Sequence, residues 1–310
     1  MKLVFMGTPA FAVPSLERIV EAGHQVIAVF TQPDRPKGRG QKDAMPPVKE
    51  AALRLGVPVY QPERVRRPEV IEQLREMAPE AIIVVGYGQI IPKAILDIPP
   101  LGIFNVHASL LPKYRGAAPI QWAIANGEPR TGVTIMRIDE GLDTGDILRT
   151  WETEIGAEEN AMELGARLAR AGAELLVQTL AELSSIQPQP QDDSQATYAP
   201  ILNKEDGKID WQLPARQILN RIRGFEPWPG GYGFLRGQRF QICKAVLGDQ
   251  ALPPGALRVV NRKLYAGCGG IGSGDGESLE LREVQLEGKK RMPAAAFLNG
   301  FPLTGGEVLQ

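Results

Sequence analysis

The sequence is poor in the residues that hold disulfides and metals, with two cysteines and two histidines among 310 residues. Cys243 and Cys268 form no Cys-x-x-Cys pair, which excludes a disulfide scaffold and a cysteine zinc site. His24 and His107 are too few for most histidine-rich metal sites. This use of cysteine fits a reducing compartment, and we expect a cytoplasmic protein.

Long apolar runs are also missing from the sequence. No stretch approaches the roughly 20 residues that a membrane-spanning helix needs. Lys2 is followed by only four apolar residues before Gly7, a pattern unlike that of a signal peptide. We therefore expect no membrane association, and the sequence points to no protein partner.

What the sequence does contain is typical of a globular chain. Apolar residues make up 43% and charged residues 23%, which is enough for a sizeable core, and the length suggests two domains. Residues 205–310 carry 14 Lys and Arg against 11 Asp and Glu, a balance of +3. Residues 1–204 carry the remaining 21 and 25, a balance of −4. A basic C-terminal part is compatible with a polyanionic partner, although ordinary surface variation produces similar differences.

The first half of the chain alternates short apolar runs with helical patterns. The runs that predict strands are residues 3–6, 26–30, 81–85, 103–107 and 132–138. The patterns that predict helices are residues 14–22, 48–55, 68–77 and 160–183. Continuous apolar strands between helices are typical of a parallel sheet covered on both faces. We therefore predict an α/β, Rossmann-like domain with a mostly parallel sheet and helices on both faces.

The character of the sequence changes after residue 183. Residues 184–204 begin with a stretch rich in Pro, Gln, Ser and Asp, which predicts a linker. From residue 205 onward turn residues are dense, and short strands are predicted at 238–245, 256–260 and 279–285. We therefore predict a catalytic domain at 1–183, a linker at 184–204 and a smaller β-barrel or sandwich domain at 205–310.

Asn105 and His107 end one predicted strand. Side chains two positions apart on a strand share a face, and ligands of open parallel sheets bind beyond the carboxyl ends of the strands. An amide donor and a titratable imidazole are thus predicted side by side at a ligand site. The alternative is a pair that only satisfies its own hydrogen bonds at a strand end.

Residues 139–146 (DEGLDTGD) follow the predicted strand 132–138. We expect this loop to leave the same edge of the sheet, where one of its acids can reach and orient His107. The alternating acids of a calcium loop are missing, and the alternative is a solvated acidic turn.

Two further loops follow predicted strands. Residues 86–92 (GYGQIIP) contain glycines that let backbone N–H and C=O groups face a flat heterocycle, although turn geometry explains those glycines equally well. Residues 109–116 (SLLPKYRG) follow the strand of His107, and Pro112 stiffens this loop.

The segment of residues 31–47 between a predicted strand and helix is longer than the two to six residues usual for such loops. Its cations are Arg35, Lys37, Arg39 and Lys42. A basic loop with glycines at 38 and 40 can order on a phosphate backbone, and the alternative is a plain solvated loop.

Taken together, these segments match a known family. Residues 105–121 (NVHASLLPKYRGAAPIQ) resemble the signature of the folate-dependent formyltransferases, and Asp143 in residues 141–145 (GLDTG) matches the family's aspartate. Residues 5–9 (FMGTP), 31–36 (TQPDRP) and 224–229 (GFEPWP) resemble the members that act on an aminoacylated tRNA. The resemblance covers nearly the whole chain.

This resemblance implies transfer of the formyl group of 10-formyltetrahydrofolate to the α-amino group of methionine on initiator tRNA. Asn105 and His107 would stabilise the oxyanion and Asp143 would orient the imidazole, with no metal. The tRNA would contact the basic segment (Arg35, Lys37, Arg39 and Lys42) and an OB-like C-terminal domain. The folate would lie against Gly86, Tyr87, Gly88, Gln89, Ile90, Ser109, Leu110, Leu111, Pro112 and Leu142.

Other functions remain open at this point. A sugar-nucleotide or purine-precursor formyltransferase would use the same Asn105, His107 and Asp143. A tRNA-binding protein with an inert enzyme-like domain would keep the basic segment but transfer no formyl group. A dehydrogenase is disfavoured because Gly7-Thr8-Pro9 breaks the glycine fingerprint of dinucleotide-binding sites.

Overall fold

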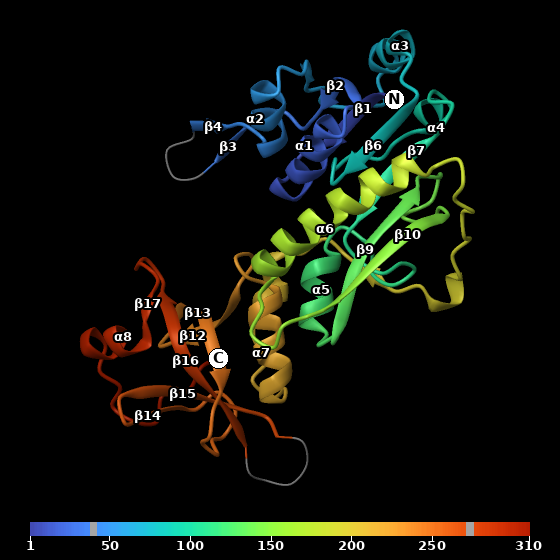
Figure 1. Cartoon of the computed structure of the whole chain (residues 1–310). Coiled ribbons are helices and arrows are strands. Elements are labelled where there is room, and N and C mark those ends of the chain that lie inside the picture. Colours follow the sequence, from blue (N-terminus) through green and yellow to red (C-terminus); the bar gives the residue numbers. More distant parts are fainter. Residues whose placement is uncertain (38–41, 271–275) are drawn as a thin grey trace. The chain divides into compact units, whose positions relative to one another are not determined.

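The computed structural model describes residues 1–37, 42–270 and 276–310 (Figure 1). The described chain divides into two compact units. Unit 1 comprises residues 1–119, 130–154 and 165–200, and unit 2 comprises residues 120–129, 155–164 and 201–310. No helix in these described ranges is long and apolar enough to cross a membrane.

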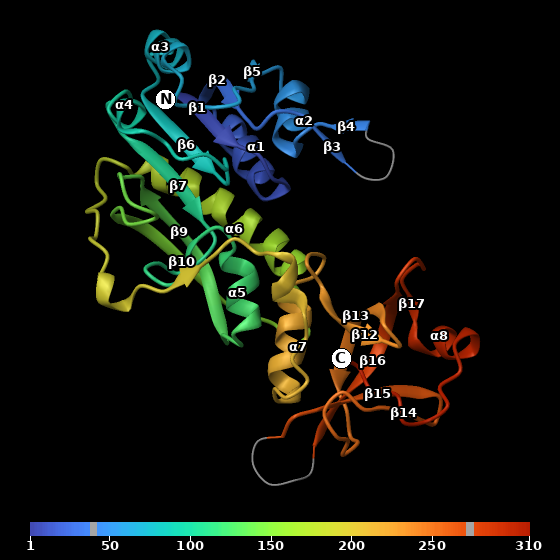
Figure 2. The ribbon, with the colours of Figure 1, turned by 180° about the vertical axis from the view of Figure 1, so that it is seen from behind.

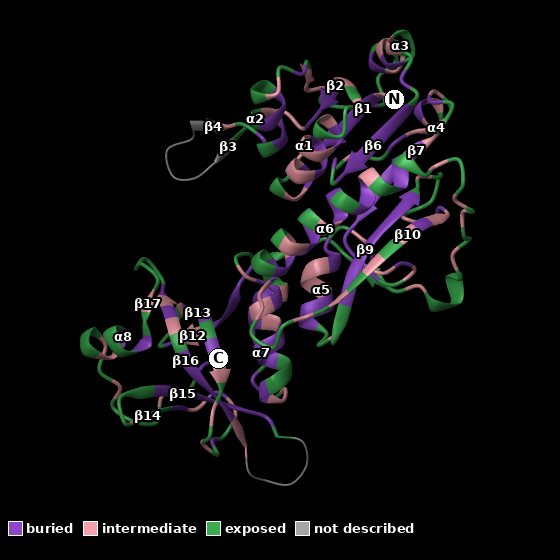
Figure 3. Cartoon of the chain, viewed as in Figure 1, coloured by how far each residue is buried: buried purple, intermediate pink, exposed green. Residues whose placement is uncertain are grey.

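Unit 1 is built on a mostly parallel sheet. Its strands, in spatial order, are β10 (Ile147–Glu154), β9 (Arg130–Arg137), β7 (Ile103–His107), β6 (Ala81–Val85), β1 (Lys2–Gly7), β2 (Gln25–Phe30) and β5 (Val59–Tyr60). The strands from β7 to β5 run parallel, whereas β9 is antiparallel to both of its neighbours. Figure 3 shows β1, β6 and β7 buried, as expected for parallel strands covered on both faces.

Helices cover both faces of this sheet. They are α1 (Val13–Glu21), α2 (Pro47–Arg54), α3 (Pro68–Met77), α4 (Lys93–Leu96) and α6 (Ala161–Ala181), with the short η1 (Ala10–Ala12) before α1. Figure 1 shows α1 and α6 in front of the strands, and Figure 2 shows them behind. The opposite face packs residues of α3 and α4 against Val4, Met6 and Ile82. The predicted α/β, Rossmann-like fold is confirmed.

Local sequence explains where these helices begin and end. Pro47 and Pro68 occupy the first turns of α2 and α3, where the missing N–H of proline costs no hydrogen bond. Gly23 and Gly56 follow α1 and α2 with φ of 81° and 69°, the left-handed backbone that ends a helix.

The direction of β9 differs from our expectation. Phe104 pairs with Arg137 and His107 with Thr134, so β9 runs opposite to β7. The prediction that residues 139–146 leave the sheet at the same edge as His107 is therefore wrong. An apolar run that is buried on both faces reads the same in either direction, so the pattern does not encode strand polarity.

Residues 184–200, predicted as part of a linker, pack onto unit 1. They include η2 (Asp193–Gln195) and β11 (Tyr198–Ala199), which pairs with β8 (Arg115–Gly116). The backbone of Gln189 also pairs with that of Ile147 at the start of the edge strand β10. In Figure 1 and Figure 2 this segment, coloured yellow, runs along the β10 side of unit 1.

The segment of residues 31–47, predicted as a loop, contains paired strands in its described part. β3 (Arg35–Lys37) and β4 (Lys42–Ala44) form an antiparallel ribbon. Asp34 lies at the base of this ribbon and accepts hydrogen bonds from Lys49 and Gln61. The hydrogen bond from Lys49 has the largest effect and that from Gln61 the next, and both hold the pKa of the Asp34 carboxyl below its usual value.

Unit 2 contains an antiparallel sheet. Its strands are β12 (Gly231–Leu235), β13 (Gln238–Leu247), β16 (Glu277–Leu286), β15 (Lys263–Cys268) and β14 (Leu257–Val260), with β17 (Met292–Pro293) paired to β16. Its helices are α5 (Pro119–Ala125, from residue 120), α7 (Ala215–Gly224), α8 (Ala294–Gly300) and η3 (Lys204–Gly207). Residues of α7 and α8 share one core with Phe240, Leu264 and Leu281. The predicted β-rich C-terminal part is thus confirmed as an antiparallel sheet.

Candidate active site

Asn105 and His107 lie together on β7, as the strand period requires. Their exposed fractions are 9% and 5%, so both polar side chains are buried. Within the described residues, no hydrogen bond to the Asn105 side chain is present. The Asn105 amide is not among the fully buried polar groups that lack a partner in the described residues, so solvent, and therefore a ligand group, can reach it.

The imidazole of His107 is held in one orientation. Its Nε2 lies 3.0 Å from the carbonyl oxygen of Tyr114. A carbonyl oxygen can only accept a hydrogen bond, so Nε2 carries the proton in this contact. Nδ1 faces Asp143 Oδ2 at 3.7 Å, which is longer than a hydrogen bond. Nδ1 is therefore the nitrogen that can exchange a proton or donate to a substrate.

Asp143 is presented by a strained loop. Its φ of 53° is left-handed, a conformation that costs a non-glycine residue about 1–3 kcal/mol and persists only where the surroundings enforce it. Oδ2 of Asp143 accepts a hydrogen bond of 2.8 Å from the backbone N–H of Gly116. Although β9 leads away from His107, the loop thus folds back far enough to bring Asp143 to the imidazole.

Hydrogen bonds within the loop that carries Asp143 also hold its shape. Oδ1 of Asp139 accepts hydrogen bonds from the Gly141 N–H at 3.0 Å and from Thr144 Oγ1 at 2.7 Å. Asp139 thus behaves as expected for an acidic turn, which is the alternative interpretation of residues 139–146. Asp143 instead points at His107.

The predicted folate loop after β6 is fixed by its own polar groups. The carbonyl of Tyr87 accepts hydrogen bonds from Thr8 Oγ1 and Gln32 Nε2 at 3.0 and 3.1 Å. The amide of Gln89 accepts from the Val65 N–H at 2.7 Å and donates to the Pro62 carbonyl at 3.2 Å. Tyr87 is buried, and burial raises the pKa of its phenol. The backbone carbonyl of Tyr87 and the side chain of Gln89 thus fix the shape of the loop.

Two predicted folate residues have exposed apolar side chains. Ile90 is 90% exposed and Leu142 is 60% exposed, on the loops after β6 and β9. The ammonium of Lys93, in α4, lies 3.7 Å from Glu140 Oε1 and so connects the two regions. Gly86 and Gly88 have φ of 57° and 81°, which glycine adopts freely. Exposed apolar side chains on a loop with glycine backbone are a chemical match for a flat heterocycle.

The loop after β7 is held by Thr134 of β9. Thr134 Oγ1 donates to the Ser109 carbonyl at 2.7 Å and accepts from the Leu111 N–H at 3.2 Å. The Ser109 hydroxyl donates to the Lys113 carbonyl at 2.6 Å, and the Leu111–Pro112 peptide is cis. Ser109 therefore supports the loop with its hydroxyl, while Leu110 is only partly buried.

The predicted tRNA-binding residues are described only in part. Arg35 is exposed at the start of β3. The backbones of Lys37 and Lys42 pair across the ribbon. Arg39 lies outside the described residues. The role of these four residues stays a prediction.

Reactive thiols and a metal centre find no support in the described structure. Cys243 and Cys268 are buried and unpaired, and burial raises the pKa of their thiols to about 11 and about 12. Within residues 1–37, 42–270 and 276–310, no cluster of His, Cys, Asp or Glu is arranged to hold a metal ion.

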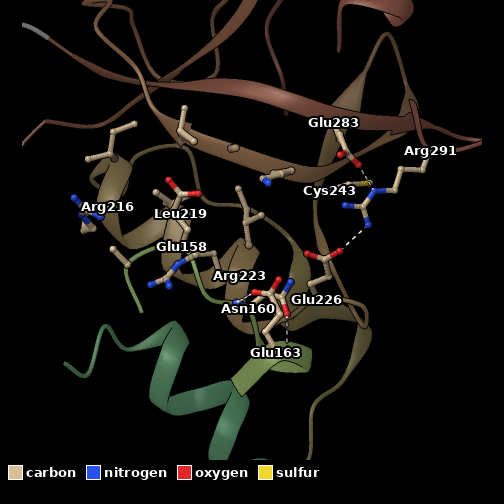
Figure 4. Close-up of a pocket in the computed structure, with 16 residues that line it drawn as sticks. Glu158, Asn160, Glu163, Arg216, Leu219, Arg223, Glu226, Cys243, Glu283 and Arg291 are labelled. Atoms are coloured by element: carbon tan, nitrogen blue, oxygen red, sulfur yellow. Dashed lines mark hydrogen bonds and ion pairs between the residues drawn. The ribbon is translucent and has the colours of Figure 1, made fainter. Parts of the chain in front are cut away.

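A cavity of about 380 Å³ lies in unit 2, between α7, β13 and the segment before α6 (Figure 4). Two of its arginines are paired with protein groups. Arg291 donates to Glu226 and Glu283, and Arg223 donates to the carbonyls of Gly156 and Glu159. None of the predicted catalytic residues lines it.

Sequence reasoning missed three groups that hold the predicted catalytic residues or the predicted folate loop after β7. They are the Tyr114 carbonyl, the Gly116 N–H and the Thr134 hydroxyl. Backbone groups carry no residue-type signal, although Tyr114 and Gly116 fall inside the motif at 109–116. Thr134 sits in an apolar strand pattern, where a threonine also reads as an ordinary β-former.

Comparisons of sequence identify relatives over the whole chain. Residues 1–180 match the family Formyl transferase, and residues 201–302 match the family Formyl transferase, C-terminal domain. A relative from Solibacter usitatus (strain Ellin6076), named Methionyl-tRNA formyltransferase, is 62% identical over 100% of this chain and 98% of its own length. A relative of the same name from Koribacter versatilis (strain Ellin345) is 58% identical over 97% of this chain and 96% of its own length.

Solved structures share the fold at lower identity. An N-formyltransferase from Helicobacter canadensis, solved with folinic acid and dTDP-3-aminofucose, has a TM-score of 0.66 and 22% identity over 91% of this chain and 98% of its own. The protein HypX from Aquifex aeolicus, solved with tetrahydrofolic acid, has a TM-score of 0.64 and 17% identity over 97% of this chain and 47% of its own.

Proposed function

Because this chain belongs to the formyl transferase family, we propose that it transfers the formyl group of 10-formyltetrahydrofolate to the α-amino group of methionine on initiator tRNA. The product is N-formylmethionyl-tRNA for translation initiation. The two relatives named Methionyl-tRNA formyltransferase, which are 62% and 58% identical over nearly their whole lengths, support this acceptor. Both substrates belong to a reducing cytoplasm, which fits the unpaired thiols of Cys243 and Cys268.

The observation that carries the proposed chemistry is the amide of Asn105, which makes no hydrogen bond within the described residues and lies beside His107 on β7. When an amine attacks a formyl carbon, negative charge develops on the formyl oxygen. The Asn105 amide and the protonated Nδ1 of His107 are the donors for that oxygen. Donors fixed in a buried site stabilise such charge strongly, because they need little reorganisation and compete with little water.

Asp143 prepares this site in two ways. Its carboxylate lies 3.7 Å from Nδ1 of His107 and can orient that side of the ring in the site. The same carboxylate can take the proton that the attacking amine must lose, directly or through one water, and return a proton to the folate nitrogen as its bond to the formyl carbon breaks and tetrahydrofolate leaves. The hydrogen bond from Gly116 fixes its position while it does so.

The remaining predicted residues hold the substrates. The backbone from Gly86 to Ile90, the side chain of Leu142 and the loop 109–112 would hold the pterin of the folate. The basic segment at 35–42 and an OB-like C-terminal domain at 205–310 would hold the tRNA. The proposed reaction needs no metal ion.

The test supplies purified protein with 10-formyltetrahydrofolate and a panel of acceptors. The panel contains methionine-charged initiator tRNA, methionine-charged elongator tRNA, glycinamide ribonucleotide and a dTDP-amino sugar. We expect formylated product mainly with the initiator tRNA, and none above background from the His107→Ala variant. Product with another acceptor alone, or with none of them, would reject the proposal.

A further inference from the structure

Gln191 lies in the segment predicted as a linker, yet its side chain contacts the loop that carries Asp143. Its Nε2 donates to the backbone carbonyl of Asp143 at 2.9 Å and to that of Gly145 at 2.7 Å. Its Oε1 accepts from Nε and Nη2 of Arg115 at 3.1 and 2.8 Å. Both the NH₂ group and the carbonyl oxygen of the Gln191 side chain are therefore hydrogen-bonded.

The orientation of this amide is fixed by its neighbours. Arginine can only donate and carbonyl oxygens can only accept, so Oε1 of Gln191 must face Arg115 and Nε2 must face the loop. A side-chain amide that donates its two N–H groups to two carbonyls of one loop restrains that loop at two points. Here the two points flank Thr144, directly after Asp143.

Arg115 anchors the other end of Gln191. The Arg115 side chain is 3% exposed, and its Nη2 also donates to Asp193 Oδ1 at 2.7 Å. A buried guanidinium must keep its partners, because an unpaired charge in that position is costly. Gln191 is thus fixed to the body of unit 1.

The segment of residues 191–199 also holds Gly116, whose N–H binds the Asp143 carboxylate. The Ala199 carbonyl accepts from Ala117, and the Thr197 carbonyl accepts from Arg115, both at 2.9 Å, on either side of Gly116. Gly116 supplies the N–H that binds the Asp143 carboxylate. Residues 191–199 therefore restrain the Asp143 backbone through Gln191 and the Asp143 carboxylate through the position of Gly116.

We propose that Gln191 is a positioning residue for formyl transfer: it holds Asp143, in its strained left-handed conformation, against His107. This inference rests on the proposed function. Gln191 does not touch the reacting atoms and acts through Asp143.

The test is Gln191→Glu. The carboxylate still offers an oxygen to Arg115, but its other oxygen meets the Asp143 and Gly145 carbonyls and can no longer donate. Misplacing a catalytic group by about 1 Å costs up to roughly 10²-fold in rate, so we expect kcat to fall by about 10-fold to 10²-fold. Gln189→Glu is the matched control. Gln189 is exposed in the same segment and pairs with Ile147 through its backbone, so its kcat should stay at the wild-type value.

A double-mutant cycle separates positioning from a general loss of structure. In an Asp143→Asn background we expect Gln191→Glu to lower kcat little further, because its effect passes through the Asp143 carboxylate. Losses in kcat that multiply, or a Gln191→Glu enzyme as fast as wild type, would overturn the inference.

If Gln191→Glu does not fold, as judged by circular dichroism, Gln191→Asn replaces it in the same cycle and the same criteria apply. The proposed function fails separately, because it fails only if the wild-type protein itself produces no formylated tRNA. An active wild type with multiplicative losses rejects the positioning role alone.

Discussion

At the scale of single residues, the site combines a free donor with a strained acid. The Asn105 amide has no partner within the described chain, and Asp143 and Tyr114 both have left-handed backbones, with φ of 53° and 61°. A strained backbone lowers stability, so folding alone does not favour it, and the Asn105 amide adds no internal hydrogen bond to the fold. Their coincidence beside one imidazole fits a site arranged for a substrate.

Asn105→Ala should lower kcat by about 10²–10³-fold, the usual cost of one lost oxyanion donor. The melting temperature should hardly change, because Asn105 gives up no internal hydrogen bond. Formylation kinetics and thermal unfolding measure the two effects. Asn299→Ala, on the exposed side of α8, is the control. A kcat within about threefold of wild type would remove Asn105 from the mechanism.

Glu307 makes the stability of unit 2 depend on pH. Its side chain is 7% exposed and accepts hydrogen bonds from the Thr304 backbone and from Arg236, which lower its pKa to about 2. A carboxyl whose pKa is lower in the folded state stabilises the fold above its ordinary pKa of 4.5. That contribution is lost as the pH falls from 4.5 toward about 2.

Comparing Glu307→Gln with wild type measures this contribution. The difference in melting temperature should be largest at neutral pH and should shrink steadily as the pH falls through that range. A difference that is constant with pH would show that the Glu307 charge does not stabilise the fold.

Sequence and structure agree best where a side chain acts through its own chemistry. Asn105, His107 and Asp143 could be singled out because their residue types and spacing carry the signal. Tyr114, Gly116 and Gln191 could not, since the first two contribute backbone groups and the third lies in a stretch whose composition predicts a linker. Hydrogen bonds from such a stretch depend on the tertiary fold.

At the scale of elements, the loop at 139–146 connects the fold to the chemistry. Helices and most strands follow from apolar periodicity, whereas the reversed β9 does not, because periodicity carries no direction. The reversal matters here, since it sends the chain to the far edge of the sheet. Only a loop that folds back can then return Asp143 to His107.

Gly145→Ala should displace the loop that brings Asp143 to His107. A Cβ on Gly145 would lie 2.0 Å from the carbonyl oxygen of Arg137, and backbone cannot yield as a flexible side chain does. The loop must then shift, so we expect kcat to fall by at least about tenfold. Gly300→Ala, where a Cβ meets no atom within 4 Å, is the control. Wild-type kinetics for Gly145→Ala would show that the loop position is not critical.

At the scale of the whole molecule, the distribution of charge bears on the acceptor. The balance of +3 in residues 205–310 against −4 in residues 1–204 is modest, and the basic segment at 35–42 adds local positive charge. Contacts to phosphates release counterions, so they weaken as salt rises. Contacts to a folate depend much less on salt.

We therefore expect KM for methionyl-tRNA to rise as salt increases from about 50 to 200 mM, while KM for the folate changes little. Steady-state kinetics with each substrate varied in turn provide both values. Arg39→Ala should reduce the slope for tRNA. A flat salt dependence for tRNA would leave the basic segment without its predicted role.

The pairing of β11 with β8 has a practical consequence for dissecting the protein. A fragment that stops at residue 183, the predicted end of the catalytic domain, would leave β8 single and Arg115 buried without Gln191 and Asp193. Extending the fragment to residue 200 restores all three contacts. A fragment that keeps these contacts therefore includes most of the stretch whose composition predicts a linker.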